Sequence, residues 1–181
     1  MLEKILVGLA VAVLGGVVVV ALQPAEYRVA RRATIDAPPA TVFAEVNDLH
    51  RFQRWNPFAR LDPAARNTFE GALVGTGAAL AWSGNSRIGE GRLTITESRP
   101  AELVRMRLDF IRPFASTSVA DFTFAPEGGG TALTWSMTGR RNFIAKAMGL
   151  VIGMDRMIGD PFEQGLATLK SVAEAAGAPR S

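Results

Sequence analysis

The sequence contains few side chains that could carry out chemistry. It has no cysteine and a single histidine, His50, which excludes a thiolate nucleophile, a zinc–sulfur site and a two-histidine metal site. His50 could act as a general acid or base if its imidazole reached a binding site. Its place at the end of a predicted helix favours a surface position instead. We therefore expect no metal and no cofactor.

Two other charged residues are candidates for a role in a site. Asp109 alternates with Phe110 along a predicted strand, so it should face solvent and would turn inward only if the register slipped by one residue. Arg31 shares the parity of Val29 and Ala33 and could point inward to hold an acidic headgroup. A strand end or a bulge would instead let it reach water. On this basis the sequence predicts no catalytic residue.

Nucleotide and nucleic-acid sites have little support. The glycine-rich stretch 71–77 lacks a following Lys-Ser or Lys-Thr pair, and the glycines of 128–130 fall in a predicted hairpin. The formal net charge is +3, but the arginines are scattered singly along the chain and form no run that could track a phosphate backbone. We expect no nucleic-acid partner.

Large apolar side chains offer a different kind of site. Strand alternation and helix spacing turn a set of aromatic, methionine and isoleucine side chains toward one interior, and aromatic and methionine side chains suit an irregular apolar ligand. Unless sheet and helix interlock, in which case the set simply fills a core, these side chains predict a site for a hydrophobic small molecule. The predicted ligand-binding residues are Trp55, Trp82, Met106, Phe110, Phe122, Trp135, Met137, Met148, Ile152 and Met154. Trp55 belongs to Trp55-Asn56-Pro57-Phe58, which could close one mouth of a cavity or form a turn that seals the core.

A sheet and a long helix must position these side chains. Residues 27–36 alternate as a half-buried strand, and residues 39–49 and 51–55 have helical spacing. Between residues 67 and 139 the period of two returns in short pieces separated by turns, which predicts an antiparallel meander. Residues 142–176 are again helical, with Asp160-Pro161 and three glycines as possible points of bending. The fold class is α+β, with one domain over residues 24–181.

The first 23 residues have the composition of a membrane anchor. Ile5 to Leu22 form a stretch of 18 residues without a charged or hydrogen-bonding side chain, and as a helix they would span about 27 Å, close to the hydrocarbon thickness of a bilayer. We interpret this segment as a retained single-pass helix rather than a cleaved signal, because its start is not basic and a small-residue cleavage site is missing.

The anchor carries two weaker indications. Gly8, Ala12 and Gly16 lie four residues apart on one helical face, a spacing that allows a weak dimer through this helix. Arginines follow the span more densely than lysine precedes it, since Arg28 and two further arginines come within about ten residues. This asymmetry places the folded domain on the cytoplasmic side of the membrane.

Several short motifs accompany this order of elements: Ile35-Asp36-Ala37-Pro38, Val42-Phe43, Trp55-Asn56-Pro57-Phe58, Gly75-Thr76-Gly77-Ala78, Gly130-Thr131 through Thr134-Trp135, and Phe162-Glu163-Gln164-Gly165-Leu166. Together they resemble the polyketide cyclase/dehydrase-like branch of the START-related (SRPBCC) superfamily, from Tyr27 to Glu174. The resemblance implies a helix-grip fold, in which a curved antiparallel sheet wraps around a long C-terminal helix. It also implies a hydrophobic ligand, without implying a reaction.

Three functions remain open on the sequence alone. The first is membrane-tethered binding or transfer of a lipid-like or polycyclic molecule in an internal cavity. The second is a cyclase- or dehydratase-like enzyme acting on such a molecule, which would require an ionisable group inside the cavity. The third is a protein-interaction module, which a contiguous exposed apolar patch outside the cavity would favour.

Overall fold

Antiparallel hairpins build most of the domain. The computed structural model describes residues 1–177, apart from the side chains of Leu2, Val151, Ile152 and Met154. Its seven strands form one sheet in the order β1-β7-β6-β5-β4-β3-β2, so each neighbouring pair except β1 and β7 is consecutive in sequence. The strands are β1 (Glu26–Ile35), β2 (Arg66–Gly71), β3 (Ala78–Ser83), β4 (Glu90–Arg99), β5 (Leu103–Arg112), β6 (Ser116–Glu127) and β7 (Gly130–Arg140).

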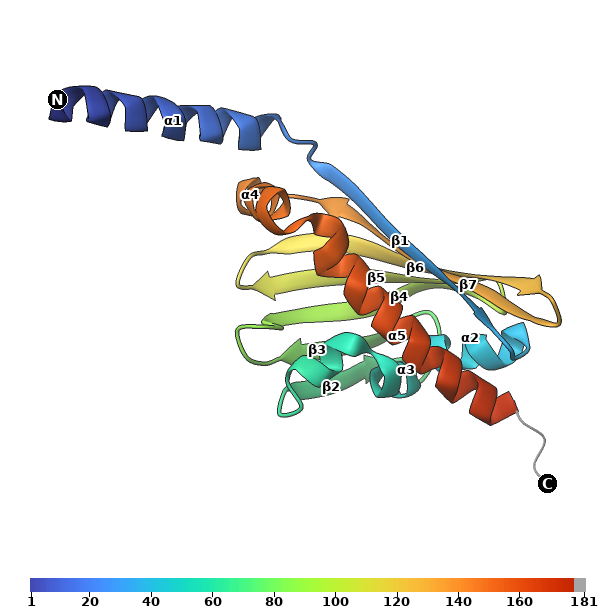
Figure 1. Cartoon of the computed structure of the whole chain (residues 1–181). Coiled ribbons are helices and arrows are strands. Elements are labelled where there is room, and N and C mark those ends of the chain that lie inside the picture. Colours follow the sequence, from blue (N-terminus) through green and yellow to red (C-terminus); the bar gives the residue numbers. More distant parts are fainter. Residues whose placement is uncertain (178–181) are drawn as a thin grey trace.

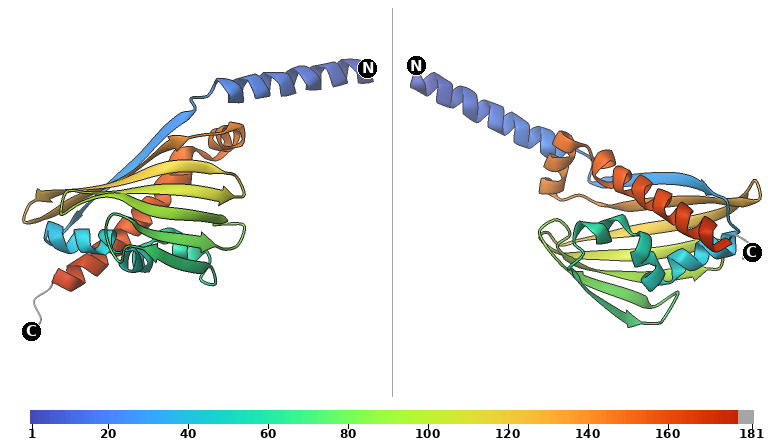
Figure 2. Two further views of the ribbon diagram at one scale, coloured as in Figure 1. Left: turned by 180° about the vertical axis from the view of Figure 1, so that it is seen from behind. Right: turned by 60° about the horizontal axis from the view of Figure 1, so that its bottom comes forward.

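Helices cover the concave face of this sheet (Figure 1). The predicted helical segments correspond to α2 (Pro39–Asn47) and α3 (Leu49–Trp55), followed after the sheet by α4 (Phe143–Ile152) and α5 (Met154–Gly177). The 3-10 turn η1 (Pro57–Leu61), which follows α3, was not predicted from the sequence. The Asp48 side chain caps α3 by accepting from the backbone N–H of His50 at 2.9 Å. The arrangement is the helix-grip fold that the sequence predicted, with α5 lying across the sheet (Figure 2).

The C-terminal helical segment is interrupted at one position. Gly153 has a φ of +84°, a conformation that side chains other than glycine rarely adopt, and it ends α4 and separates it from α5. Pro161, another of the predicted points of bending, lies inside α5. The change of direction at Gly153 carries α4 away from the sheet, so that its main contacts are with α1 (Leu2–Leu22) and α5.

The antiparallel topology gives the domain two distinct ends. We call the end where β1 begins and α4 lies the near end; it also holds the turns between β3 and β4 and between β5 and β6. The far end holds α2 and the turns between β4 and β5 and between β6 and β7. At the far end α2, α3 and the second half of α5 pack onto the sheet around fully buried side chains, namely Ile35, Val42, Val46, Trp55, Phe122, Leu133, Phe162 and Leu169.

Helix α1 projects from the near end (Figures 1 and 2). It touches the domain at its last turn, where Lys146 Nζ donates to the carbonyl oxygen of Ala21 at 3.0 Å. Within the described part of the chain, Glu3–Leu22 is the one helix whose length and composition would allow it to cross a membrane, and its most apolar window is wholly unburied.

Candidate ligand-binding cavity

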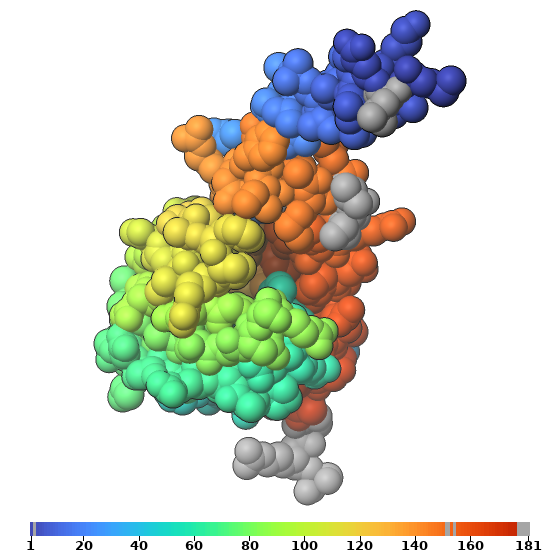
Figure 3. Space-filling view, turned by 90° about the vertical axis from the view of Figure 1, so that its left-hand side faces the viewer, coloured from blue at the N-terminus to red at the C-terminus, as the bar shows by residue number. Residues whose placement is uncertain are grey.

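A cavity of about 270 Å³ lies between the concave face of the sheet and the helices that cover it. Most of its wall is apolar, and one side comes from α3, η1 and the following loop. It opens at the near end as a hollow bounded by the β5–β6 turn, the β3–β4 turn and the α4–α5 segment (Figure 3). The apolar side chains that line it include Phe52, Phe58, Leu80, Trp82, Leu93, Met106, Leu108, Phe110, Ala120, Phe122, Trp135, Met137 and Ile158.

The cavity exists because small side chains interrupt the inner face of the sheet. Ala120 of β6 is buried and lies between Met106 of β5 and Met137 of β7 in the strand register. Its methyl group leaves room above the middle of the sheet that a large side chain would occupy. One pair of strand positions farther along, Phe122 and Trp135 are stacked with ring centroids 4.9 Å apart, and they close the floor of the cavity.

A glycine also lets the side chain of Tyr27 reach across the neighbouring strand. The register places Tyr27 of β1, Gly139 of β7 and Ser118 of β6 in one row across three strands. Because Gly139 has no side chain, the Tyr27 ring lies over β7, and its hydroxyl is hydrogen-bonded to Ser118 Oγ at 3.0 Å. A Cβ atom at position 139 would lie 2.7 Å from Ser118 Oγ and 2.9 Å from Tyr27 Cε1, so this row requires glycine.

The same arrangement recurs on the opposite wall. Trp82 of β3, Gly91 of β4 and Phe110 of β5 also form a row across three strands. The Trp82 ring lies over Gly91, where any Cβ atom would collide with it, and it meets Phe110 edge-on at a centroid distance of 5.8 Å. Its indole N–H donates to the carbonyl oxygen of Ile88 at 3.1 Å. Two aromatic side chains thus lie flat over glycines on either side of the mouth.

Six of the ten predicted ligand-binding residues line the cavity, and their binding of a ligand stays a prediction. These six are Trp82, Met106, Phe110, Phe122, Trp135 and Met137. Trp55 lies behind the wall, where it is fully buried and donates from Nε1 to the carbonyl oxygen of Glu45 at 3.0 Å. It therefore belongs to the core seal, the second of the two roles considered for its motif.

The predicted contribution of the last helical segment is different. Met148 does not line the cavity and is 41% exposed, because the turn at Gly153 carries α4 off the sheet. The side chains of Ile152 and Met154 lie outside the described part of the structure. Instead, α5 contributes Ile158 to the wall.

None of the three predicted ionisable candidates lines the cavity. The His50 side chain is exposed and its ring stacks on Phe69 at a centroid distance of 3.8 Å. Asp109 is on the outer face, as its parity indicated, and accepts hydrogen bonds from Arg107 Nε at 2.9 Å and Thr117 Oγ1 at 2.8 Å.

Arg31 does turn toward the helix side of the sheet, but carboxylates of this chain hold it. Its guanidinium lies over Gly159 of α5 and is paired with Asp155 at 2.7 Å and with Glu163 at 2.5 Å. The hydrogen bonds that Arg31 donates to these carboxylates, above all to Asp155, raise the pKa of its guanidinium group. Arg31 thus fastens the edge strand β1 to α5, and its predicted acidic partner is part of the protein.

Polar groups of the cavity wall were largely missed by sequence reasoning. Gln53, Asn56, Asp62 and Asn67 come from α3 through β2, and Arg87 comes from the β3–β4 turn. Asp62 Oδ2 accepts from the backbone N–H of Asn85 at 2.7 Å, which fastens that turn over the cavity. Strand parity is the wrong signal for these residues, because most of them lie in turns and loops.

Tyr27 is a further ionisable residue in the wall, beside Asp62 and Arg87. It has the inward parity of Val29, so alternation of the strand could have identified it. Burial raises the pKa of the Tyr27 phenol above its ordinary value of 10.0, outweighing the opposite influence of Ser118 and Arg141. The Tyr27 phenol therefore needs a more alkaline pH to ionise than an exposed tyrosine does.

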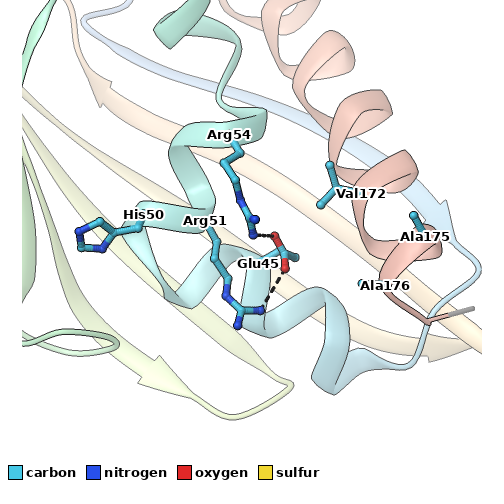
Figure 4. Close-up of a pocket in the computed structure, with 7 residues that line it drawn as sticks. All are labelled: Glu45, His50, Arg51, Arg54, Val172, Ala175 and Ala176. Atoms are coloured by element: carbon cyan, nitrogen blue, oxygen red, sulfur yellow. Dashed lines mark hydrogen bonds and ion pairs between the residues drawn. The ribbon is translucent and has the colours of Figure 1, made fainter. Parts of the chain in front are cut away.

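A second hollow lies at the far end, between α3 and the end of α5 (Figure 4). Its central feature is the buried carboxylate of Glu45, which is paired with Arg51 and Arg54, each at 3.1 Å. The Arg51 guanidinium is also 3.4 Å from Asp48. Because two carboxylates compensate two guanidinium groups, this hollow holds no excess charge for a ligand, and its ion pairs join α2 to α3.

The domain is similar in fold to several solved structures. Protein CV1439 from Chromobacterium violaceum matches with a TM-score of 0.58 at 16% identity, over 84% of this chain and 99% of that chain. Protein Mll3558 from Rhizobium loti matches with a TM-score of 0.56 at 24% identity, over 81% and 96% of the two chains.

A third similar structure comes from a biosynthetic pathway. The di-domain ARO/CYC StfQ of the steffimycin pathway matches with a TM-score of 0.62 at 12% identity, over 85% of this chain and 53% of that chain. At these identities the likeness concerns the fold. No protein with a curated description matches the sequence.

The family follows from the sequence match itself. The family model for polyketide cyclase/dehydrase and lipid transport matches residues 26–174, which run from the first residue of β1 to near the end of α5. This match covers every strand and every helix that surrounds the cavity. The chain therefore belongs to the polyketide cyclase/dehydrase and lipid transport family.

Proposed function

We propose that the protein binds a compact apolar molecule in the cavity while α1 holds the domain at a membrane. The observation that carries this proposal is the cavity itself, about 270 Å³ in volume and lined mainly by aromatic, methionine and aliphatic side chains. Ligand sites of small molecules have this character, with a few polar groups among apolar ones. Membership of a family that includes lipid-transport proteins supports the same function.

The size of the cavity limits the ligand. An apolar cavity of about 150 Å³ accommodates benzene, so the cavity in this protein suits a bicyclic molecule or a short acyl chain. A larger molecule would extend through the mouth at the near end. The six predicted residues in the wall, Trp82 and Phe110 near the mouth among them, would supply most of the contact area.

The tether is the second part of the proposal. Residues 1–23 would form the anchor and residues 24–181 the domain, with only Gln23, Pro24 and Ala25 between α1 and β1. A linker this short keeps the near end of the domain, where the mouth of the cavity lies, close to the bilayer. We place the domain on the cytoplasmic face, since Arg28, Arg31 and Arg32 follow the span within about ten residues, whereas Lys4 alone precedes it.

A weak dimer through α1 remains part of this proposal. A Cβ atom at Gly8 or at Gly16 would meet nothing within 4 Å, so this face of the helix is open to a second copy. Close approach of two helices at such small residues gives packing that bulky side chains would prevent.

Native mass spectrometry of the full chain in a mild detergent tests the binding function. We expect 1-naphthol, an uncharged bicyclic probe, to give a saturable complex with one molecule per chain that survives release from the micelle. A mass spectrum that shows only the chain without bound probe at every probe concentration would contradict a defined cavity site. So would a number of bound probe molecules that keeps rising without saturation. A molecule that copurifies with the chain and is displaced by the probe would identify the natural ligand class.

Cyclase-like chemistry is the second candidate, and Tyr27 is the observation that favours it. Tyr27 lines the cavity and its phenol is protonated at neutral pH, so it could donate a hydrogen bond to a carbonyl oxygen of the ligand. Product formation from a linear poly-β-ketone should then fall sharply in Tyr27→Phe, which retains the ring. Equal turnover by the variant would remove Tyr27 from the chemistry.

A further inference from the structure

The near end of the domain carries several exposed apolar side chains. Seven of them are between 37% and 52% exposed. They belong to the end of β5, the β5–β6 turn, α4 and the start of α5. The set consists of Ile111, Phe114, Phe143, Ile144, Met148 and Leu150, with Met157 beside them.

These side chains surround the mouth of the cavity. The β5–β6 turn forms one border of the hollow in Figure 3, and α4 with the start of α5 forms the opposite border. Helix α1 leaves the domain from this same side (Figures 1 and 3). Elsewhere in the domain, the large apolar side chains described as exposed are Phe69, Leu73 and Val74, in β2 and the turn after it.

The α4 border of this surface is basic, whereas Glu90 pairs with Arg112 at the β5 border and Asp155 pairs with Arg31 at the start of α5. Residues 130–154 contain Arg140, Arg141 and Lys146 and no acidic residue. Lys146 is the one charged residue among the ten of α4, and its ammonium group is held at the carbonyl oxygen of Ala21. Arg141 Nη2 donates to the carbonyl oxygen of Pro24 at 2.6 Å. Both cations therefore lie where the apolar span of α1 ends.

We infer that α4 and the Ile111–Phe114 segment rest in the surface of the bilayer that α1 spans, so that the cavity opens directly onto lipid. The inference rests on the proposed tether. A helix with apolar side chains and flanking cations binds at the boundary between headgroups and acyl chains, where cations attract anionic lipids. The partner is therefore a lipid bilayer with anionic headgroups, and the ligand passes between bilayer and cavity without entering water.

The absence of cysteine permits a direct test with the full chain. Single-cysteine variants Phe114→Cys and Met148→Cys, labelled with an environment-sensitive fluorophore, are reconstituted in phosphatidylcholine–phosphatidylglycerol vesicles with a shallow spin-labelled lipid as quencher. Leu73→Cys is the matched control, because Leu73 is apolar and 84% exposed but lies at the far end. We expect lipid quenching at positions 114 and 148 to be several-fold stronger than at position 73.

The outcomes separate this inference from the tether and from the cavity. Protein that stays in the vesicles after a high-salt wash but shows equal, weak quenching at all three positions overturns the inference and leaves the tether standing. Label-to-label quenching at positions 114 and 148, without lipid quenching, would assign the surface to a second copy and overturn it as well. Loss of the protein from the vesicles would overturn both tether and inference, whereas the 1-naphthol experiment in detergent tests the cavity independently.

Discussion

The two ends of the domain use the same sheet and the same helix with opposite results. At the far end, Phe162 of α5 stacks on Trp135 at a centroid distance of 3.8 Å, and Trp55 meets Trp135 edge-on at 5.7 Å. At the near end, the inner face of the sheet carries the small side chain of Ala120, and α4 turns away at Gly153. The cavity lies where the interlocked packing of the far end stops.

This difference indicates how a single fold can combine stability with an open site. Close packing of large side chains provides most of the stabilisation of a small domain. The far end supplies that packing, so the side chains of the near end can border a cavity without interlocking across it. A binding site in this fold therefore requires no separate domain, only smaller residues at one end of the strands and a helix that ends early.

The largest expected effect is on stability at the far end. Phe162→Ala should lower the free energy of unfolding by about 3–5 kcal/mol, because it removes a fully buried ring and leaves a void. Phe110→Ala at the cavity should cost well under half as much, since that ring already borders empty space. Urea unfolding of the full chain in detergent measures both, and equal losses would remove the distinction between the ends.

A smaller effect is expected from filling one of the glycine rows. Gly139→Ala should cost about 1–3 kcal/mol through overpacking, because the new methyl group would displace the Tyr27 ring from Ser118. In the control Gly149→Ala, the added methyl meets only Arg141 Nη1, at 3.4 Å, and should be neutral or slightly stabilising in its helix. An unchanged stability of Gly139→Ala in the same unfolding experiment would show that the row tolerates a side chain.

The smallest effect concerns the ionisation of Tyr27. It is the single tyrosine of the chain, so its pKa can be followed directly by ultraviolet absorbance, and we expect a value above 10.0. Because the pKa is higher in the folded state, the associated stability is complete below pH 10 and is lost as the pH rises through the folded-state pKa. Tyr27→Phe should lack this part of the alkaline loss.

Titrating Tyr27 with and without a bound ligand gives a sharper test of its burial. A ligand that displaces water from the cavity should raise the pKa of Tyr27 further, since burial is the dominant cause of the shift. An apparent pKa at or below 10.0 in the free protein would contradict the burial of Tyr27. The same value with and without probe would place the probe elsewhere.

Much of the sheet could be predicted, because the alternation of apolar and polar residues along a strand decides which side chains share one face. Once one face is buried, Trp82, Met106 and Trp135 must share it, and the structure places all three around the cavity. Arg31 was correctly given inward parity, but its carboxylate partners Asp155 and Glu163 could not be foreseen. They are more than 120 residues away along the chain, and their contact depends on how α5 crosses β1.

The position of the mouth could not be predicted for a related reason. The last helical segment contained several residues that could end a helix, and local sequence does not decide among Gly149, Gly153, Gly159 and Pro161. The backbone turns at Gly153, and that choice removed Met148 from the cavity. The roles of Gly91 and Gly139 depend on the register between three strands, which a single sequence leaves undetermined.

One paired measurement tests the central claim, that the near end of the sheet encloses a site for an apolar molecule. Ala120→Phe fills the cavity from β6, whereas Ala125→Phe adds the same ring to the same strand on its exposed outer face. With 1-naphthol and native mass spectrometry, we predict that Ala120→Phe loses the one-to-one complex while Ala125→Phe and the unaltered chain retain it. A folded Ala120→Phe variant that binds the probe as tightly as Ala125→Phe would contradict the account.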